Sequence, residues 1–293
     1  MKITNKYGVP QTLVNLMERD TYSRGSCHIS VTQLIDAPRI KILKEKHADD
    51  MVQDVSESLW SMVGRAMHLV AEGGADDEHL AEERLFAKVL GWDLSGGIDL
   101  QKIGEVVKIM DYKFTSVWAA LQNKPEWERQ LNTYSWLARV NKGWATNGLE
   151  ICALLRDWNR RDAQRGNGYP PAPIMTVPVK LWSFEEQQAY VEERIKLHQE
   201  AWRAEEWGDT LPLCSAEERW AKPDKWALKK QDAKRATALF EDPEAAKAEL
   251  LKRGGGYYLE KRNGEQTRCL AFCQAMQWCE QFKAFNQSPL DDL

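Results

Sequence analysis

Two aspartates and a lysine in the first half of the chain have the types and spacing that can hold a divalent cation. Asp111 and Lys113 stand two residues apart near the end of the apolar run 105–113, so on a β-strand they share one face. A charged pair at the rim of an apolar face is costly unless a partner or a metal satisfies it. Asp99 follows a Gly-Gly turn, which lets a second strand bring its carboxylate close to Asp111.

The chemistry of this set is that of a Mg²⁺ or Mn²⁺ site. Carboxylate oxygens of Asp99 and Asp111 are the hard ligands that these ions prefer, and Lys113 can orient a water or offset charge on a phosphoryl transition state. His68 is a further candidate ligand, because neutral imidazole binds ions of the Mn²⁺ type, and Glu82 is a weaker one. The alternatives are a solvated strand end, a structural histidine and a solvated glutamate.

The hydrophobic pattern predicts the elements that must position these groups. Helix 54–72 has two lines of residues one turn apart: an apolar face of Leu59, Val63, Met67 and Val70, and a second line of Trp60, Gly64 and His68. Gln130 and Tyr134 form a polar edge, or ordinary surface, on helix 125–140. The other expectations are short helices over 1–50, a loop over 157–173, a long helix over 185–206, and strands over 84–90, 96–100, 105–113, 151–155 and 175–181.

Composition bounds the classes of protein. The chain has 293 residues, of which 43% are hydrophobic and 29% charged, as in a globular protein. Because no apolar run approaches ~18 residues, an integral membrane protein is excluded, and the polar start of the chain predicts no signal peptide and a cytoplasmic location. The net charge of -4 gives no general affinity for nucleic acid, so any polyanion site must be local.

Taken in order, these motifs resemble the RecB-like branch of the PD-(D/E)XK nucleases, which includes AddB-type exonuclease domains and the nuclease of CRISPR adaptation. The matching motifs are Gly64-x-x-x-His68, Glu82, Gly97-Ile98-Asp99, Asp111-Tyr112-Lys113 and Gln130-x-x-x-Tyr134, within about residues 28–160. Ile98 stands where a proline is common in the family. As a whole, the chain resembles stand-alone nucleases encoded by bacteriophages, which would place it in the host cytoplasm.

This resemblance implies an α/β fold, a restriction-endonuclease-like core whose mixed central sheet is flanked by helices. It also implies that Asp99, Asp111 and the backbone after Asp111 bind the metal, with His68 as an extra ligand. Lys113 is then catalytic, and the pair Gln130 and Tyr134 positions the DNA strand.

Cysteines near the C-terminus give a second candidate metal site. Cys269, Cys273 and Cys279 lie close together in the sequence, and Cys214 is a natural fourth thiol. Four thiolates suit an iron–sulfur cluster or a structural zinc. The related families carry a 4Fe–4S cluster, but their first cysteine lies near the N-terminus and two residues separate the second and third. Here three residues follow Cys269, so a 4Fe–4S cluster, Zn²⁺ and free thiols all remain open.

The segment 215–268 between these cysteines is expected to be a small β-β-α-β insert, with strands 226–230, 235–240 and 257–261 and a helix at 243–252. In its first part six basic residues stand against two acidic ones. We expect contacts with a phosphate backbone, as an alternative to a solvated face, through Lys229, Lys230, Lys234 and Arg235. The expected organisation is a nuclease core with an N-terminal helical arm (1–213), a cysteine-clamped region (214–279) and a C-terminal tail (280–293).

The leading hypothesis is a Mg²⁺- or Mn²⁺-dependent deoxyribonuclease. Because no P-loop sequence occurs, the chain has no motor of its own, and an exonuclease that processes DNA ends in phage recombination or replication is the preferred form. Its partners would be DNA and a recombination protein. One alternative is a catalytically silent nuclease fold that binds DNA or protein and is stabilised by the cysteine site. Another is a metalloprotein that does not act on nucleic acid, which leaves the paired motifs unexplained.

Overall fold

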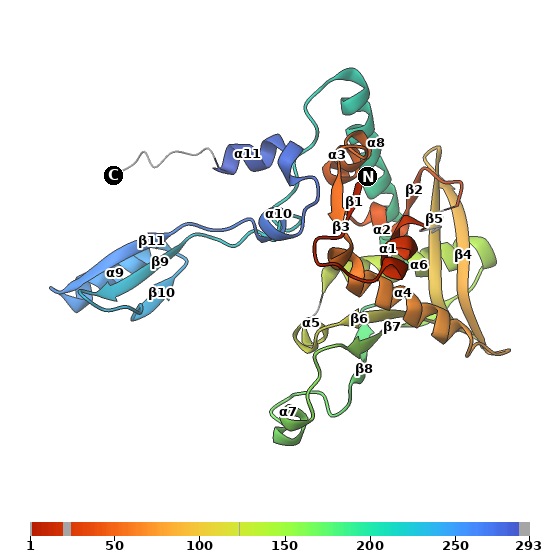
Figure 1. Cartoon of the computed structure of the whole chain (residues 1–293), viewed down its shortest axis with the longest axis horizontal. Helices are drawn as coiled ribbons and strands as arrows, with labels where there is room; N and C mark the ends of the chain where they lie inside the picture. Colours follow the sequence, from red (N-terminus) through yellow and green to blue (C-terminus); the bar gives the residue numbers. More distant parts are fainter. Residues whose placement is uncertain (1, 20–24, 123, 287–293) are drawn as a thin grey trace.

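A mixed six-stranded sheet forms the centre of the computed structural model, which describes residues 2–19, 25–122 and 124–286. The strand order is β2-β5-β6-β7-β8, and β4 pairs with β5. The β2–β5 and β6–β7 pairs are parallel and the other pairs are antiparallel (Figure 1). The strands are β2 (Ile29–Ser30), β4 (His79–Val89), β5 (Trp92–Lys102), β6 (Val107–Thr115), β7 (Thr146–Leu155) and β8 (Ile174–Val179). The predicted α/β architecture with a mixed central sheet is confirmed.

One edge of β5 has a gap that matters for the site. β4 pairs along one edge of β5, while the other edge is shared by β2, at Leu94–Ser95, and by β6, at Leu100–Lys102. Among the described residues, 96–99 have no strand partner on that second edge. The strands β5 and β6 therefore separate at Asp99, where the predicted ligands lie.

Helices cover the sheet and fix this geometry. They are α2 (Val31–Leu34), α3 (Pro38–Lys46), α4 (Leu59–Glu72), α5 (Val117–Leu121), α6 (Pro125–Lys142), α7 (Arg160–Arg165) and α8 (Phe184–Trp207). α6 begins with a proline in its first turn and ends at Gly143 in the left-handed conformation, as its sequence predicts. It packs closely on β5 because Gly96 has no side chain: a Cβ there would lie 2.6 Å from Leu137 and 2.9 Å from Val31.

The apolar face predicted for the helix over 54–72 is wrong. Among its residues only Met62 is buried, whereas Leu59 is 40% and Val70 72% exposed. Met62 packs with Val14 and other residues of the N-terminal part in a small separate core. The helix is apolar on most of its circumference, so periodicity alone could not select the buried side.

The N-terminal part is less helical than expected. β1 (Lys2–Thr4) pairs in parallel with β3 (Val52–Asp54), and both lie near α1 (Gln11–Glu18) and the 3-10 turn η1 (Val55–Ser58). The segment around Ile29 begins as strand β2 before it turns into α2. Backbone pairing with β5 therefore overrides the helical pattern there.

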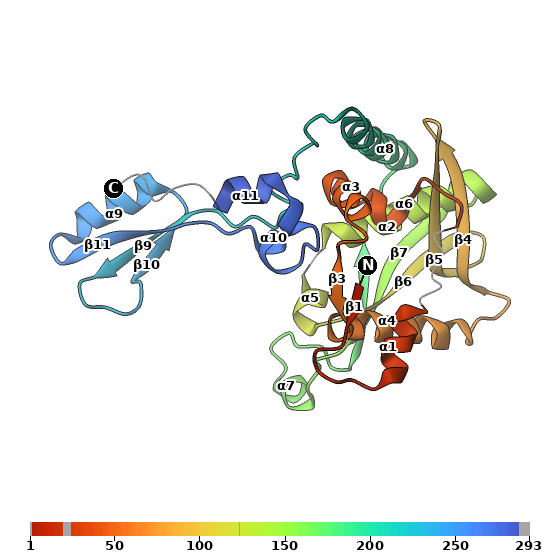
Figure 2. The ribbon, with the colours of Figure 1, turned by 45° about the horizontal axis from the view of Figure 1, so that its top comes forward.

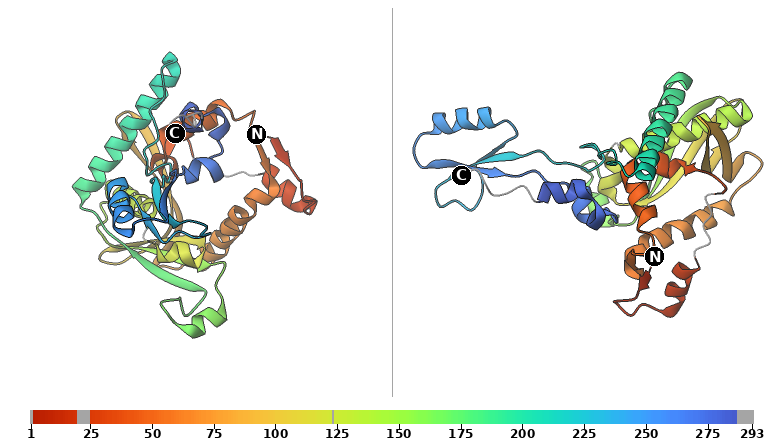
Figure 3. Two further views of the ribbon diagram at one scale, coloured as in Figure 1. Left: turned by 90° about the vertical axis from the view of Figure 1, so that its left-hand side faces the viewer. Right: turned by 90° about the horizontal axis from the view of Figure 1, so that it is seen from above.

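A three-stranded antiparallel sheet lies apart from the central sheet (Figures 2 and 3). It consists of β9 (Lys225–Lys230), β10 (Ala238–Phe240) and β11 (Tyr257–Arg262), with α9 (Pro243–Arg253) against it. These elements lie where the sequence pattern placed the strands and helix of the insert. The chain then returns toward the core at α10 (Thr267–Ala271), and η2 (Met276–Trp278) and α11 (Glu280–Asn286) follow.

No helix in the described part of the chain combines the length and the apolar character needed to cross a membrane.

Candidate active site

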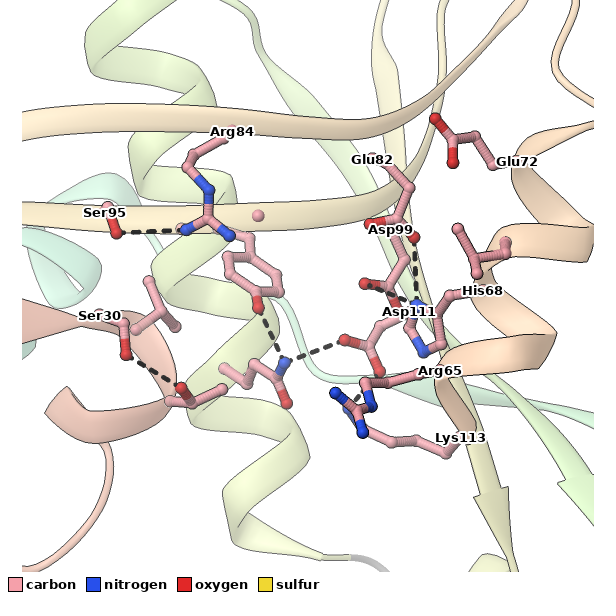
Figure 4. Close-up of a pocket in the computed structure, with 17 residues that line it drawn as sticks. Ser30, Arg65, His68, Glu72, Glu82, Arg84, Ser95, Asp99, Asp111 and Lys113 are labelled. Carbon is pink, nitrogen blue, oxygen red and sulfur yellow. Dashed lines mark hydrogen bonds and ion pairs between the residues drawn. The ribbon is translucent and has the colours of Figure 1, made fainter. Parts of the chain in front are cut away.

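A cavity of about 490 Å³ lies at the gap in the β5 edge. Its walls come from β4, β5 and β6, from α4 and α6, and from the start of α2 (Figure 4). All of the predicted ligands and the predicted catalytic lysine line it: His68, Glu82, Asp99, Asp111 and Lys113. Residues from four consecutive elements, α4, β4, β5 and β6, therefore share one open site.

The two aspartates are held by the diverging strands β5 and β6. The register pairs Leu100 with Met110, so Asp99 and Asp111 are the next residues on each strand. Instead of a ladder bond at this point, the Tyr112 N–H donates to Asp99 Oδ2 at 2.8 Å. Both carboxylates are buried, with exposures of 8% and 1%.

His68, Glu82 and Asp99 form a compact set of potential ligands. One ligand atom from each lies within 4.8 Å of the others. His68 Nδ1 is 3.1 Å from Glu82 Oε1 and 3.5 Å from Asp99 Oδ1. An imidazole and two carboxylates at this spacing can hold a Mg²⁺- or Mn²⁺-type ion.

Glu82 occupies a strained position in the middle of a strand. Its φ is 51°, in the left-handed region that a non-glycine residue seldom adopts. β4 and β5 pair on both sides of it, at Ala81–Leu100 and Glu83–Ile98, but Glu82 and Asp99 themselves are not paired. Strain of this kind persists only where the surroundings enforce it, and it is concentrated at functional sites. The structure thus gives Glu82 a more central place than its sequence did.

Asp111 is fixed by neighbours from two directions. Lys113 Nζ lies 2.5 Å from Asp111 Oδ2, and Gln130 Nε2 donates to Asp111 Oδ1 at 3.0 Å. Gln130 Nε2 also donates to the Tyr134 hydroxyl at 2.9 Å. Gln130 and Tyr134 are buried, so they are not ordinary helix surface. Their contacts hold Asp111 in place, and their predicted contact with a DNA strand stays a prediction.

The electrostatics of the site call for a cation. Burial, followed by the negative charge of Asp111, raises the pKa of Asp99 to about 7. The pKa of His68 is also raised, first by its contact with Glu82 and then by the charge of Asp99. A divalent ion would offset the repulsion between these carboxylates.

Two arginines that the sequence motifs did not indicate complete the cavity. Arg65 lies on α4 and Arg84 on β4, on different walls (Figure 4). Arg84 Nη1 donates to the Ser95 hydroxyl at 3.3 Å. The sequence signal for them is their spacing from predicted ligands. Arg65 is three residues before His68 on a helix, and Arg84 is two residues after Glu82 on a strand, so each shares a face with that ligand.

The four predicted cysteines meet in a second, small cavity. Its lining contains Cys214, Cys269, Cys273 and Cys279, and all of these thiols are free. Burial raises the pKa of Cys214 to about 12, so its thiol is neutral unless a metal displaces the proton.

Arginine donors surround these thiols. Arg39 and Arg219 line the same cavity, and Arg39 Nε and Arg219 Nη1 are buried without a hydrogen-bond partner in the described part of the chain. Buried unpaired N–H groups are rare and call for an acceptor. The chemistry of this lining therefore fits an anionic metal–thiolate centre.

The basic residues of the insert are partly neutralised, contrary to the expected charge excess. Lys229 Nζ lies 2.8 Å from Glu260, and Lys222 and Lys225 pair with other glutamates of the insert. No ion pair is found for Lys230, Lys234 or Arg235 within the described residues. These three lie on the insert, away from the cavity, so the structure does not bring them together with the candidate active site.

No protein-family model matches the sequence, and no curated protein matches it. Among solved structures, the crystal structure of SSO0001 is similar with a TM-score of 0.42 and 14% identity, over 64% of this chain and 83% of that chain. An alkaline exonuclease (LHK-Exo) from Laribacter hongkongensis is similar with a TM-score of 0.32 and 10% identity, over 61% and 90% of the two chains. Likenesses this weak assign neither the fold family nor the activity.

Proposed function

We propose that this protein is a metal-dependent nuclease that hydrolyses phosphodiester bonds in DNA. One observation carries the proposal: the His68–Glu82–Asp99 set lies beside the Asp111–Lys113 pair in a single open cavity. Acidic ligands, a lysine and an open cavity are the components that metal-assisted phosphodiester hydrolysis requires.

His68, Glu82, Asp99 and Asp111 would hold Mg²⁺ or Mn²⁺. When bound, such an ion supplies a Lewis acid for the phosphoryl oxygen and lowers the pKa of a water. Their donor set, three hard carboxylates and one imidazole, suits these ions.

The chain's own side chains would do the rest. Lys113 places an ammonium next to Asp111, where it can orient the attacking water and offset charge that develops on the phosphoryl oxygens. Gln130 keeps the Asp111 carboxylate in one orientation through its hydrogen bond. Arg65 and Arg84 supply positive charge on different walls of the cavity, which suits the phosphates that flank the cleaved bond.

Degradation of labelled DNA with and without Mg²⁺ or Mn²⁺ tests this function. We expect Asp111→Asn, Asp99→Asn and Lys113→Ala each to lower the rate by roughly 100-fold or more. Asp93→Asn is the matched control, because Asp93 lies on the same strand as Asp99 but does not line the cavity. Equal rates for the wild type and all of these variants would refute the proposal.

The proposed form is an exonuclease that processes DNA ends in phage recombination or replication, alongside a recombination protein. It is supported by the sequence motifs and by the lack of a P-loop in this sequence. An exonuclease degrades linear DNA and spares closed circles of the same sequence. Cleavage of both at similar rates would indicate an endonuclease.

We also propose that the cysteine cavity holds a 4Fe–4S cluster, with zinc as the alternative. The proposal is supported by the four thiols that line one cavity together with Arg39 and Arg219, and the bound group would join the two ends of the insert 215–268. Anaerobically purified protein should absorb near roughly 400 nm, and Cys273→Ser should remove that band. Zinc in metal analysis without the band would favour the alternative.

We further propose that the insert contacts the phosphate backbone through its least neutralised cations. Replacing Lys230, Lys234 and Arg235 with glutamine should weaken DNA binding. It should also reduce the slope of the logarithm of the binding constant against the logarithm of the salt concentration by up to about three. Lys229→Gln is the comparison, since Glu260 already neutralises Lys229. An unchanged salt slope in the triple variant would rule this contact out.

A further inference from the structure

Helix α4 carries a line of residues that begins at the candidate active site and leads away from it. Trp60, Gly64 and His68 follow one another at intervals of one turn, so about 12 Å of helix separates the first from the last. His68 lies in the carboxylate set, and Arg65 from the same helix lines the cavity. The nuclease chemistry uses only the His68 end of this line.

Trp60, at the other end, is presented to solvent and held in place. It is 53% exposed, which is high for the largest side chain. Its ring lies 5.9 Å from that of Phe114, the residue after Lys113, and the Arg156 guanidinium is 5.3 Å from its centroid. Arg156 lies over one face of the ring, and about half of the Trp60 side chain remains exposed. An exposed aromatic ring that also contacts a cation is an arrangement on which nucleic-acid bases stack.

Gly64 lies between the two ends of this line, and the described part of the structure gives no reason for a glycine at this position. Glycine in a helix interior is less stable than alanine. Among the described residues, a Cβ at Gly64 would meet no atom within 4 Å beyond the neighbouring backbone of its own helix, and the φ of Gly64 is not in the left-handed region, so neither packing nor backbone geometry requires glycine. Empty space beside a helix backbone is what close approach of another chain would need.

We propose that α4 is the track for one strand of DNA: the cleaved phosphate lies at His68, the backbone passes Gly64, and an unpaired base stacks on Trp60. Arg65 and Arg156 provide positive charge along this path. The inference rests on the proposed nuclease function and narrows its substrate to single-stranded DNA. In a duplex, the bases are stacked on one another and cannot open onto Trp60.

Binding without cleavage tests the stacking contact directly. Fluorescence anisotropy of a labelled single-stranded oligonucleotide is measured in EDTA for the wild type, Trp60→Ala and Trp202→Ala. Trp202 is a matched control because it is 48% exposed on the distant helix α8. We expect Trp60→Ala to weaken binding about 5- to 150-fold and Trp202→Ala to leave it unchanged.

An abasic nucleotide, moved along the oligonucleotide one position at a time, identifies the stacked base. At one position it should weaken binding by the wild type by the same factor as Trp60→Ala, and it should cost that variant nothing further. Equal losses in both proteins at every position would overturn the stacking contact.

Gly64→Ala tests the track and separates it from folding. This variant should unfold at a higher temperature than the wild type, yet bind single-stranded DNA more weakly. Unchanged DNA binding by Gly64→Ala would overturn the track, and so would equal losses by Trp60→Ala on single strands and on blunt duplexes. If metal-dependent cleavage persists while Trp60→Ala binds normally, the track fails and the nuclease stands. If Trp60→Ala loses binding but no metal supports cleavage, the nuclease fails and a single-strand binding site remains.

Discussion

Asp99 should destabilise the metal-free protein at neutral pH, and its removal should make the fold stronger. Burial and the charge of Asp111 raise the pKa of Asp99 from 3.8 to about 7. Its protonated form is therefore favoured in the folded state. Between about pH 4 and pH 7 the folded state keeps a proton on Asp99 that the unfolded state has lost. The stability of the metal-free protein should therefore fall as the pH rises through this range. The raised pKa of His68 acts in the same direction.

The magnitude follows from the size of the pKa shift. A change of about three pKa units corresponds to about 4 kcal/mol of unfolding free energy, which is an upper bound for a carboxylate at the edge of an open cavity. Asp99→Asn should remove this penalty, so that at pH 8 the metal-free variant is more stable than the wild type by up to that amount. Below pH 4 the two proteins should have nearly equal stability.

A divalent ion should reverse the order of the two proteins. An ion at 100 times its Kd stabilises the folded state by about 2.7 kcal/mol. Mn²⁺ should therefore stabilise the wild type at pH 8 and should have little effect on Asp99→Asn. Its affinity for the wild type should fall below pH 7, because the ion must displace the protons of Asp99 and His68.

Urea unfolding at pH 5 and pH 8, in EDTA and in Mn²⁺, measures these differences. Asp93→Asn, on the same strand, should behave like the wild type in its response to the ion. The reasoning fails if the stability difference between Asp99→Asn and the wild type does not change with pH. It also fails if Mn²⁺ stabilises both proteins equally.

Three further predictions concern one residue of the site and two residues in the packing of the helices. Gln130→Leu removes the hydrogen bond to Asp111 and should lower the cleavage rate roughly tenfold or more. Steady-state assays measure this loss, and an unchanged circular dichroism spectrum shows that the variant is folded. A wild-type cleavage rate would refute the prediction. Gly96→Ala forces a Cβ against Leu137 and should cost about 1–3 kcal/mol in urea unfolding; no loss would contradict the close packing of α6. Burial lowers the pKa of His198 to about 4, so the folded state favours the neutral imidazole. This preference contributes up to about 3 kcal/mol to the unfolding free energy above pH 6.5, and the contribution is lost as the pH falls toward 4. Acid titration of stability should therefore be shallower in His198→Phe, and identical curves would exclude this role.

Local rules were sufficient where the geometry is local. The two-residue period of a strand put Asp111 and Lys113 on one face, and the structure places Lys113 Nζ 2.5 Å from Asp111. Pro125 and Gly143 mark the ends of α6 because each has a fixed backbone preference. Those residues carry their own conformational information, so no knowledge of the tertiary structure was needed.

Features set by distant segments could not be predicted from the sequence. The left-handed backbone of Glu82 has no signature in a glutamate within a strand pattern. Arg39 reaches the thiol cavity from α3, far along the chain from Cys214. Lys229 appeared unpaired in sequence, but β9 and β11 bring Glu260 within 2.8 Å of it.

The gap in the β5 edge has a consequence for how substrate recognition can evolve and be measured. Alternate backbone N–H and C=O groups along 96–99 point away from β4, toward the side where β2 and β6 leave room. Recognition by such main-chain groups survives any side-chain replacement that the fold tolerates. For a ligand that these groups bind, an alanine scan of the cavity would understate the affinity, and amide-to-ester replacement at Gly97 would measure the missing part.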